Sequence, residues 1–483
     1  MKLMGSLAKA NDRNPLLKTT GQLRPSLGGR SIRNGGKRAS RRAGMLLACA
    51  LAASALTALA DGWLDGRHHP LPQRSSLRFA ILSDLHVFDT RLGTSGAAFE
   101  AYLNQDPKLL RESEAIFDSA LQSIVKQRVQ FVLITGDLTK DGELVDHQLV
   151  AHHLARLERQ GIQVFVVPGN HDINNSDAVA FQGNTSSPVP TVSPHDFRVL
   201  YERFGYRQAI ARDEHSLSYV AEPAHGLWLL GIDSCKYEES QQRGYPVVGG
   251  RIKAETMTWI LGKLQEAKTR HKQVIAFMHH GVNQHFLGEA QIFPDYLLDD
   301  WANVSAQLAG AGLKVVFTGH YHSQDAAYPL DANGVPTATL CDVETSSLAM
   351  YPCAFRVATL DASGLSIASQ QVTEIKADTG GVPFQQYALN FLQARLPALA
   401  TYQLMTMFNL PQAQAAGAAP LVADALIANY AGDETPSAQT QGMLSGLVQS
   451  TDPALHTLGL MLSGIWTDLP PSDNQLVLPF PGN

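Results

Sequence analysis

The sequence is poor in cysteine and in charged residues. Cysteine occurs four times in 483 residues, and charged residues make up 17% of the chain against 45% apolar residues. This balance is typical of a soluble globular protein and excludes a disordered or fibrous chain. A chain of this length can form two or three domains with a sizeable core.

The first 60 residues have the pattern of an export signal. Residues 1–44 hold eleven Lys and Arg and one acid, and an apolar run over 44–60 ends in Ala58-Leu59-Ala60. A basic region, a short apolar core and an A-x-A site predict cleavage after Ala60. We therefore expect an exported, periplasmic protein, and Arg41-Arg42 fits a twin-arginine or a general secretory signal. An uncleaved membrane anchor is the alternative.

Positive charge is scarce in the rest of the chain. From residue 61 onward there are 27 basic and 43 acidic residues, a net charge of −16. Nucleic-acid binding depends on neutralising backbone phosphates, so we do not expect it here. We also expect no stable membrane span after the signal, and the sequence does not indicate the oligomeric state. Cys341 and Cys353 could form a disulfide in an oxidising compartment, which would leave Cys235 as a buried thiol.

Strand-like and helix-like segments alternate from Leu77 onward. This alternation predicts an α/β sandwich with a largely parallel sheet. Residues 61–76 are then a linker, residues 77–375 the α/β domain, and the Ala-, Leu- and Gln-rich residues 385–483 a helical C-terminal domain. The expected strands are 77–83, 129–135, 163–168, 226–233, 272–278 and 313–319, and helices are expected near 108–128, 145–160, 254–270 and 299–312.

Polar clusters follow five of these strands. In open α/β sheets, ligands gather at the carboxyl ends of the strands, so the five clusters can converge in space. Each cluster alone is consistent with a polar turn, but five in chain order favour a shared site. The clusters are Asp84-Leu85-His86, Gly136-Asp137, Gly169-Asn170-His171-Asp172, His279-His280-Gly281 and Gly319-His320-Tyr321-His322.

The residue types in these clusters point to metal ions. Residues i and i+2 of an extended segment point the same way, so Asp84 and His86 can face one centre, as can His320 and His322. Oxygen and imidazole ligands without thiolates suit Mn, Fe or Zn rather than a structural zinc site. Asp137 has two carboxylate oxygens and could bridge two cations about 3.5–4 Å apart.

With these motifs in this order, the sequence resembles the calcineurin-like binuclear metallophosphoesterases over about residues 77–360. The series D-x-H, G-D, G-N-H-D, H and G-H-x-H is complete. The resemblance implies a four-layer α/β/β/α metallophosphoesterase sandwich and two divalent metal ions. It assigns one ion to Asp84, His86, Asp137 and His322, and the other to Asp137, Asn170, His279 and His320, with Asp137 bridging.

Within that family, three segments resemble the class III cyclic nucleotide phosphodiesterases: GDLTKDGE (136–143), His279-His280, and Asp233-Ser234 with the helix that follows. Purple acid phosphatases have a Tyr ligand three residues after the bridging Asp. Lys140 stands there in this chain, which disfavours that branch. Gly281 replaces the Pro that usually follows the two histidines, which leaves loop 282–298, and hence the substrate, open.

We expect an exported dimetal phosphoesterase that hydrolyses cyclic nucleotides or other small phosphodiesters by attack of metal-activated hydroxide. The leaving alkoxide needs a proton, and His171 is predicted to supply it because it follows the ligand Asn170 in an irregular turn. Asp172 is predicted to orient His171 or to hold the loop.

The remaining polar residues in and near the motifs are not expected to bind metal. We expect His280 to point away from the metals and to pack or support a ligand, because it directly follows His279 in a strand. His285, in the next loop, is a candidate substrate contact. Asp89, Lys140 and Asp141 lie near the expected rim of the site and are predicted to be solvated loop residues.

The sequence also leaves alternative functions open. Alternative activities are those of a phosphomonoesterase or nucleotidase, or of a phosphodiesterase for lipid head groups; a nuclease is disfavoured by the acidic charge. A non-enzymatic scaffold would be expected to lose metal ligands, and none of the seven is missing.

Overall fold

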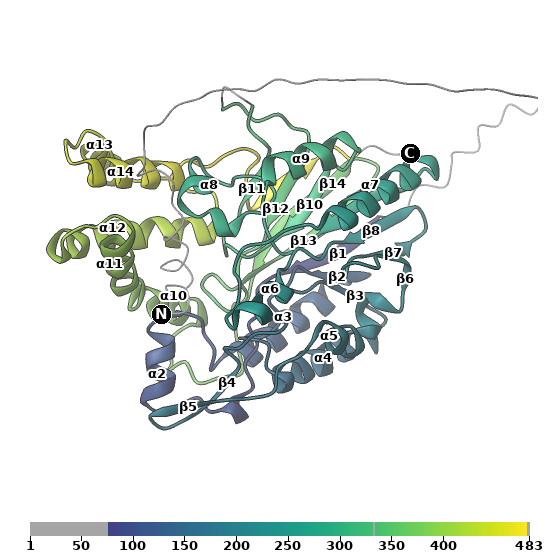
Figure 1. Ribbon diagram of the computed structural model, residues 1–483, viewed down its shortest axis with the longest axis horizontal. Coiled ribbons are helices and arrows are strands. Elements are labelled where there is room, and N and C mark those ends of the chain that lie inside the picture. The colour runs from purple at the N-terminus through teal and green to yellow at the C-terminus, as the bar shows by residue number, and fades with distance from the viewer. Residues whose placement is uncertain (1–75, 332–333, 481–483) are drawn as a thin grey trace, which may run out of the picture. The chain divides into compact units, whose positions relative to one another are not determined.

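The computed structural model describes residues 76–331 and 334–480 (Figure 1). The predicted signal peptide (1–60) and nearly all of the predicted linker (61–76) lie outside these residues. Two mixed β-sheets form the centre of the described part. The first has the strand order β15 (Gln475–Leu478), β14 (Gly364–Gln371), β13 (Ala354–Asp361), β1 (Leu77–Leu82), β2 (Phe131–Ile134) and β3 (Gln163–Val166).

The second sheet has seven strands, and its middle strands are also parallel. Its inner strands β8, β9, β10 and β12 pair in parallel, as β1, β2 and β3 do in the first sheet, and antiparallel strands complete the edges. The order is β11 (Ala326–Ala327), β12 (Cys341–Glu344), β10 (Val315–Thr318), β9 (Gln273–Phe277), β8 (Leu227–Gly231), β7 (Tyr219–Ala224) and β6 (Ala209–Arg212). A separate hairpin joins β4 (Val179–Gln182) to β5 (Thr185–Pro188).

Apolar side chains hold the two sheets face to face. Phe79 of β1 stacks on Phe131 of the neighbouring strand at 4.7 Å between ring centroids and meets Phe317 of β10, in the other sheet, edge to face at 6.0 Å. Successive side chains of a strand point to opposite faces. Along β8, Leu229 therefore joins the core between the sheets, while Trp228 joins the core beneath the outer helices.

Helices cover the outer face of each sheet, which confirms the predicted four-layer sandwich (Figure 1). Apolar residues of α3 (Ser113–Lys126) and α4 (Leu144–Glu158) pack on the first sheet. Those of α7 (Ala254–Thr269) and α9 (Trp301–Gly310) pack on the second. The shorter helices in loops are α2 (Ala97–Leu103), α5 (Pro194–Leu200), α6 (Tyr237–Arg243) and α8 (Glu289–Ile292).

The C-terminal segment is helical up to residue 465, as predicted, and then returns to the first sheet. Leu476 and Leu478 of β15 are buried and alternate with exposed residues, and β15 pairs antiparallel with β14. The prediction of a helical segment over 385–483 was therefore wrong for Gln475–Leu478. The helices are α10 (Phe384–Gln393), α11 (Leu396–Met407), α12 (Gln412–Ala431), α13 (Ala438–Val448) and α14 (Pro453–Ile465).

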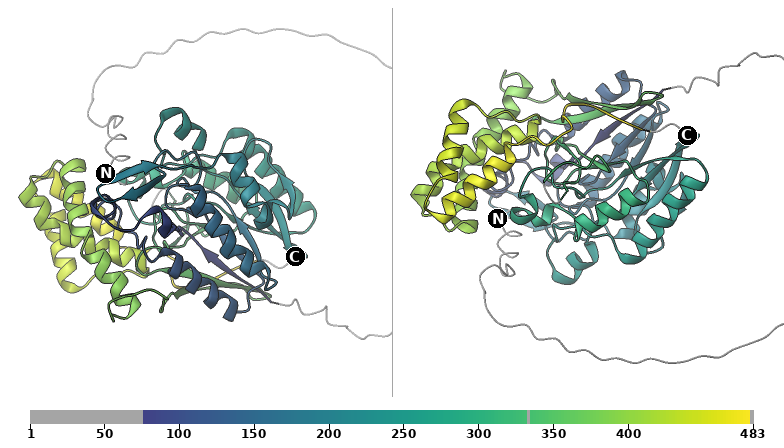
Figure 2. Two further views of the ribbon diagram at one scale, coloured as in Figure 1. Left: turned by 90° about the horizontal axis from the view of Figure 1, so that it is seen from below. Right: turned by 90° about the horizontal axis from the view of Figure 1, so that it is seen from above.

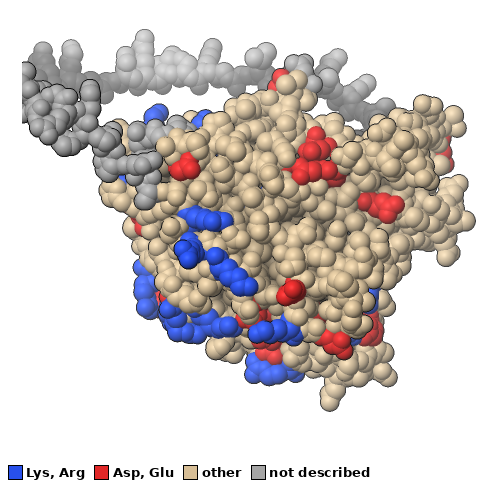
Figure 3. Space-filling model, turned by 180° about the vertical axis from the view of Figure 1, so that it is seen from behind, with Lys and Arg blue, Asp and Glu red and all other residues tan. Residues whose placement is uncertain are grey.

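Helices α11, α12 and α14 share a core with Phe286 and Tyr321, which come from the loops after β9 and β10. Figure 2 shows the C-terminal helices, in light green and yellow, gathered on one side of the sandwich. These helices are poor in charge: Asp424 is the one charged residue between positions 396 and 431. In Figure 3, the side formed by these helices shows few charged side chains, whereas lysines and arginines gather on the other side.

None of the helices in the described residues is long and apolar enough to cross a membrane. Cys235, Cys341 and Cys353 are buried free thiols, without the disulfide considered above.

Candidate metal centre

The seven predicted metal ligands meet where both sheets end. Three strands of the first sheet, β1, β2 and β3, and two of the second, β9 and β10, lead into the segments that carry them. The geometry is therefore that of a site at the carboxyl ends of parallel strands. The ligands that follow these strands in chain order are Asp84 and His86, Asp137, Asn170, His279, and His320 and His322; six are buried and His322 is largely so.

The backbone at these positions is unusual. Five of the seven ligands have left-handed φ angles: Asp84 (50°), His86 (39°), Asp137 (49°), His320 (79°) and His322 (73°). Side chains disfavour this region, and such strained residues persist where the surroundings hold them.

Two glycines allow the loops to come together. A side chain at Gly169 would collide with the carboxylate of Asp137, and one at Gly319 would collide with Ser83 and Asp84. The glycines in the G-N-H-D and G-H-x-H motifs are therefore required by close approach.

Asp84, His86 and His322 form the first cluster of donor atoms, all within 4.8 Å of one another. The His322 Nε2 atom lies 3.1 Å from Asp84 Oδ1 and 3.3 Å from His86 Nε2. Asp84 Oδ2 accepts a hydrogen bond from the main-chain N–H of His320, but Asp84 Oδ1 is buried without a hydrogen-bond partner. A buried carboxylate oxygen without a partner beside two imidazole nitrogens fits a metal ion.

Asp137, His279 and His320 form the second cluster, with Asn170 beside it. His279 Nε2 lies 3.4 Å from Asp137 Oδ2 and 2.9 Å from Asn170 Oδ1. The other ring nitrogen of His279 faces the carbonyl oxygen of Thr135 at 2.9 Å. His320 Nε2 faces a main-chain carbonyl oxygen, that of Asp295, so its Nδ1 remains for a metal. Such contacts fix the orientation of an imidazole ligand.

Asp137 lies between the two clusters. Its Oδ2 atom is 3.6 Å from His86 Nε2 in the first cluster and 3.4 Å from His279 Nε2 in the second. The donor set of carboxylates, imidazoles and one amide therefore fits two divalent cations that share Asp137, as in two-metal sites. The predicted division of ligands between the two ions is consistent with these distances.

The site favours positive charge next to Asp137. Burial lowers the pKa of His279, but the Asp137 carboxylate raises it more, to about 9. Burial and the neighbouring imidazoles of His280 and His279 hold the pKa of His320 well below its usual value. An imidazole ligand is deprotonated, so a cation bound beside Asp137 would take the place of the proton on His279.

His171 points toward the shared carboxylate but is held by Asp141. The Nδ1 atom of His171 lies 2.8 Å from the main-chain oxygen of Lys140 and 3.0 Å from Asp141 Oδ1, and its Nε2 atom lies 3.8 Å from Asp137 Oδ2. The side chain is 23% exposed, in contrast to the ligands around it. Nε2 is therefore the atom that can meet a substrate.

Asp172 holds the loops together and does not orient His171. Its carboxylate accepts hydrogen bonds from the main-chain N–H groups of Gly169, Leu138 and Thr139, and from the Thr139 hydroxyl. Of the two predicted roles, the structure supports the second. Burial, together with Asp137, raises the pKa of Asp172 to about 7.

Asp89, Lys140 and Asp141 are buried, so the prediction that they are solvated was wrong. Lys140 Nζ pairs with Asp141 Oδ2 at 2.6 Å and with Glu143 Oε1 at 2.7 Å, and the Tyr102 hydroxyl lies 3.2 Å from Asp141. Burial lowers the pKa of Lys140, but the two carboxylates raise it above its usual value. Sequence reasoning missed Asp141 as the partner of His171, because a polar run after a strand resembles a surface turn.

His280 and His285 lie outside the two clusters. His280 contacts Ser234 Oγ at 2.8 Å and the carbonyl oxygen of Val248 at 2.9 Å, and its ring packs 4.4 Å from that of His320. It thus supports a ligand, as expected. His285 is 1% exposed and contacts Asp325 Oδ1 at 2.9 Å. It is not accessible to a substrate, which contradicts its predicted role.

Comparison with known proteins identifies a family, and the matched residues include all seven ligands. Residues 77–324 match the model of the family described as calcineurin-like phosphoesterase. The chain is similar to a dimetal phosphatase from Danio rerio (14% identity, 62% of this chain and 97% of that chain, TM-score 0.44). It is also similar to a purple acid phosphatase from yellow lupin, Lupinus luteus (13% identity, 63% and 53%, TM-score 0.39). A search of curated proteins finds no match.

We predict that Asp137→Asn lowers the content of bound divalent metal from two ions per chain to one or none. A neutral amide cannot bridge two cations as a carboxylate does, so phosphoester hydrolysis should fall at least about 100-fold. Metal analysis and initial rates measure both effects, with the exposed Glu255→Gln as control. Full activity with two bound metals in Asp137→Asn would contradict the bridging role.

Proposed function

This chain belongs to the calcineurin-like phosphoesterase family and is a hydrolase of phosphate esters, and we propose that it acts on small phosphodiesters, cyclic nucleotides among them. We further propose that the protein is exported, on the basis of its basic and apolar N-terminal residues.

The charge around His171 is the observation that favours a diester. Lys140 is paired with Asp141 and Glu143, and Lys108 with Asp106 at 3.0 Å. Neither lysine is then a free partner for a phosphate. A phosphodiester carries one negative charge and a phosphomonoester up to two, so a site whose two nearby lysines, among the described residues, are already paired with carboxylates suits the diester better.

The protein's own residues supply the rest of the chemistry. Two bound divalent cations would offset the phosphate charge and lower the pKa of the attacking water. His171 faces the same space through Nε2, while Lys140 and Asp141 fix its other ring nitrogen. Burial lowers the pKa of His171, while Asp137 and the hydrogen bond to Asp141 raise it, and the net direction is upward. Cations bound to Asp137 would offset its share, so Asp141 is the group that can hold a proton on the ring for a leaving alkoxide.

Substrate preference is tested by a screen of the metal-loaded protein. We expect kcat/KM for bis(p-nitrophenyl) phosphate to exceed that for p-nitrophenyl phosphate by at least about tenfold, which corresponds to about 1.4 kcal/mol. The 2′,3′- and 3′,5′-cyclic nucleotides identify the natural type of diester. Hydrolysis of the monoester alone would overturn the phosphodiesterase proposal.

The role of His171 is tested by the leaving group. His171→Ala should slow hydrolysis of a diester with an alkyl leaving group about 100-fold or more, because the alkoxide must be protonated. The same change should slow loss of p-nitrophenolate less than about tenfold, because this anion leaves without a proton. Asp141→Asn should show the same pattern more weakly, and the exposed His152→Ala serves as control. Equal losses on both substrates would exclude the acid role.

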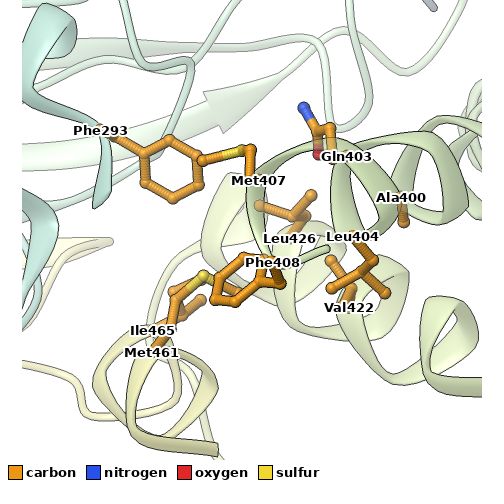
Figure 4. A pocket seen from close by; sticks show the side chains of 10 residues that line it. All are labelled: Phe293, Ala400, Gln403, Leu404, Met407, Phe408, Val422, Leu426, Met461 and Ile465. Carbon is orange, nitrogen blue, oxygen red and sulfur yellow. The ribbon is translucent and has the colours of Figure 1, made fainter. Parts of the chain in front are cut away.

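A phosphodiester with a lipid-like tail is a second candidate, favoured by an apolar pocket. Figure 4 shows the pocket, which α11, α12, α14 and Phe293 line with apolar side chains and one polar residue, Gln403. The Phe293 ring packs 6.0 Å from that of Tyr296, which in turn packs 4.9 Å from the ring of the metal ligand His320. Two packed rings, those of Phe293 and Tyr296, therefore connect the pocket to the metal ligand His320.

We predict that Met407→Gln in this pocket lowers kcat/KM about tenfold for a long-chain alkyl phosphodiester, because burying an apolar side chain against the tail is worth about 1.5–3 kcal/mol. Hydrolysis of bis(p-nitrophenyl) phosphate should be unchanged. Met405→Gln is the matched control, because Met405 lies on the same helix and is 39% exposed outside the pocket. The lipid candidate would be excluded if chain length had no effect on kcat/KM in the wild-type protein.

A further inference from the structure

Three carboxylates from distant parts of the chain meet outside the metal centre. Asp325 lies between His322 and β11, Glu434 follows α12, and Asp473 precedes β15. One carboxylate oxygen of each lies within 4.8 Å of the others, and the three residues are only 3%, 6% and 0% exposed. None of the three is used by the phosphoesterase chemistry.

Positive charge around this cluster is insufficient to balance it. His285 pairs with Asp325, but it also lies 3.5 Å from Asp342 and 3.6 Å from Glu344, which are buried carboxylates too. The buried Arg356 donates hydrogen bonds to the main-chain oxygens of Asp325, Glu344 and Asp473. Buried carboxylates in excess of their cations are unfavourable unless a proton or another cation joins them.

Two unpaired oxygens at this place indicate a missing partner. Glu434 Oε2 and Asn429 Oδ1 are both buried without a hydrogen-bond partner, and Asn429 is 1% exposed. The two side chains are joined, because Asn429 Nδ2 donates to Glu434 Oε1 at 2.8 Å. The Asn429 amide group therefore lies against the cluster. Buried oxygens of this kind are almost always bound to something.

We propose that Asp325, Glu434 and Asp473 bind a hard divalent cation of the Ca²⁺ type, with the amide of Asn429 beside it. Ca²⁺ takes carboxylate and amide oxygens together with water, and tolerates irregular geometry. The ion joins the loop after His322 to the segments that follow α12 and precede β15. The site is distinct from the dimetal centre, because all of its donors are oxygens and it shares no residue with that centre.

Protons are the competing explanation for the cluster. Burial and the nearby Asp325 raise the pKa of Glu434 to about 8 and that of Asp473 to about 9. The two explanations differ in measurable ways, because a bound ion adds to the metal content and stabilises the folded protein in proportion to its concentration.

The experiment adds Ca²⁺ at pH 8 to the full protein already loaded with its catalytic metals. We expect one Ca²⁺ per chain by metal analysis and a rise in Tm of about 3 °C at a concentration well above Kd. Glu434→Gln and Asp473→Asn should abolish both effects, whereas Asp424→Asn, an exposed carboxylate on α12, should keep both. Asp137→Asn should keep the Ca²⁺ while it loses catalytic metal.

Three results would overturn the proposal. The first is a wild-type protein that binds no Ca²⁺ and shows no change in Tm, which decides the question even if the variants do not fold. The second is an unchanged Ca²⁺ content in Glu434→Gln, which would place the ion elsewhere. The third is a Glu434→Gln protein that is more stable than the wild type while neither binds Ca²⁺, which would assign protons to the cluster.

Discussion

The carboxylate of Asp137 is the group on which the arrangement of the site depends. It lies between the two clusters of donor atoms, with three imidazoles within 4 Å of its Oδ2 atom. Its Oδ1 atom accepts a hydrogen bond from the main-chain N–H of His171. The three imidazoles come from three different loops, two after strands of the first sheet and one after a strand of the second, so both sheets must end at the same place for the contacts to form together. The packing between the sheets therefore serves the site directly.

A layer of buried polar residues surrounds the ligands and fixes their loops. Asp172 binds main-chain groups of two loops, and Lys140 holds Asp141 and Glu143 away from the solvent. A buried ion pair of this kind contributes little net stability, but removing one partner leaves an unpaired buried charge. These residues thus give the site a defined geometry rather than a large gain in stability.

Much of the fold and of the site could be predicted from the sequence, because the patterns that indicate them lie within short stretches of the chain. The strands are apolar runs, and the ligands directly follow them, so Asp84, Asp137 and His279 could be placed without knowledge of tertiary contacts. The burial of Lys140 could not be predicted, because it depends on Tyr102 and Glu143, which close over it only in the folded chain. Likewise β15 is recognisable only through its pairing with β14. The burial of His285, a predicted substrate contact, could not be foreseen either, because its partner Asp325 is 40 positions away.

The left-handed backbone of five metal ligands has a consequence for any attempt to improve this protein. A side chain in that region costs about 1–2 kcal/mol relative to glycine, so each ligand position is locally less stable than it could be. Glycine at these positions would relieve the strain but would remove the main-chain hydrogen bonds that Asp84 and Asp137 accept. A screen for heat resistance alone would therefore keep or lose each ligand on this balance, without regard to turnover.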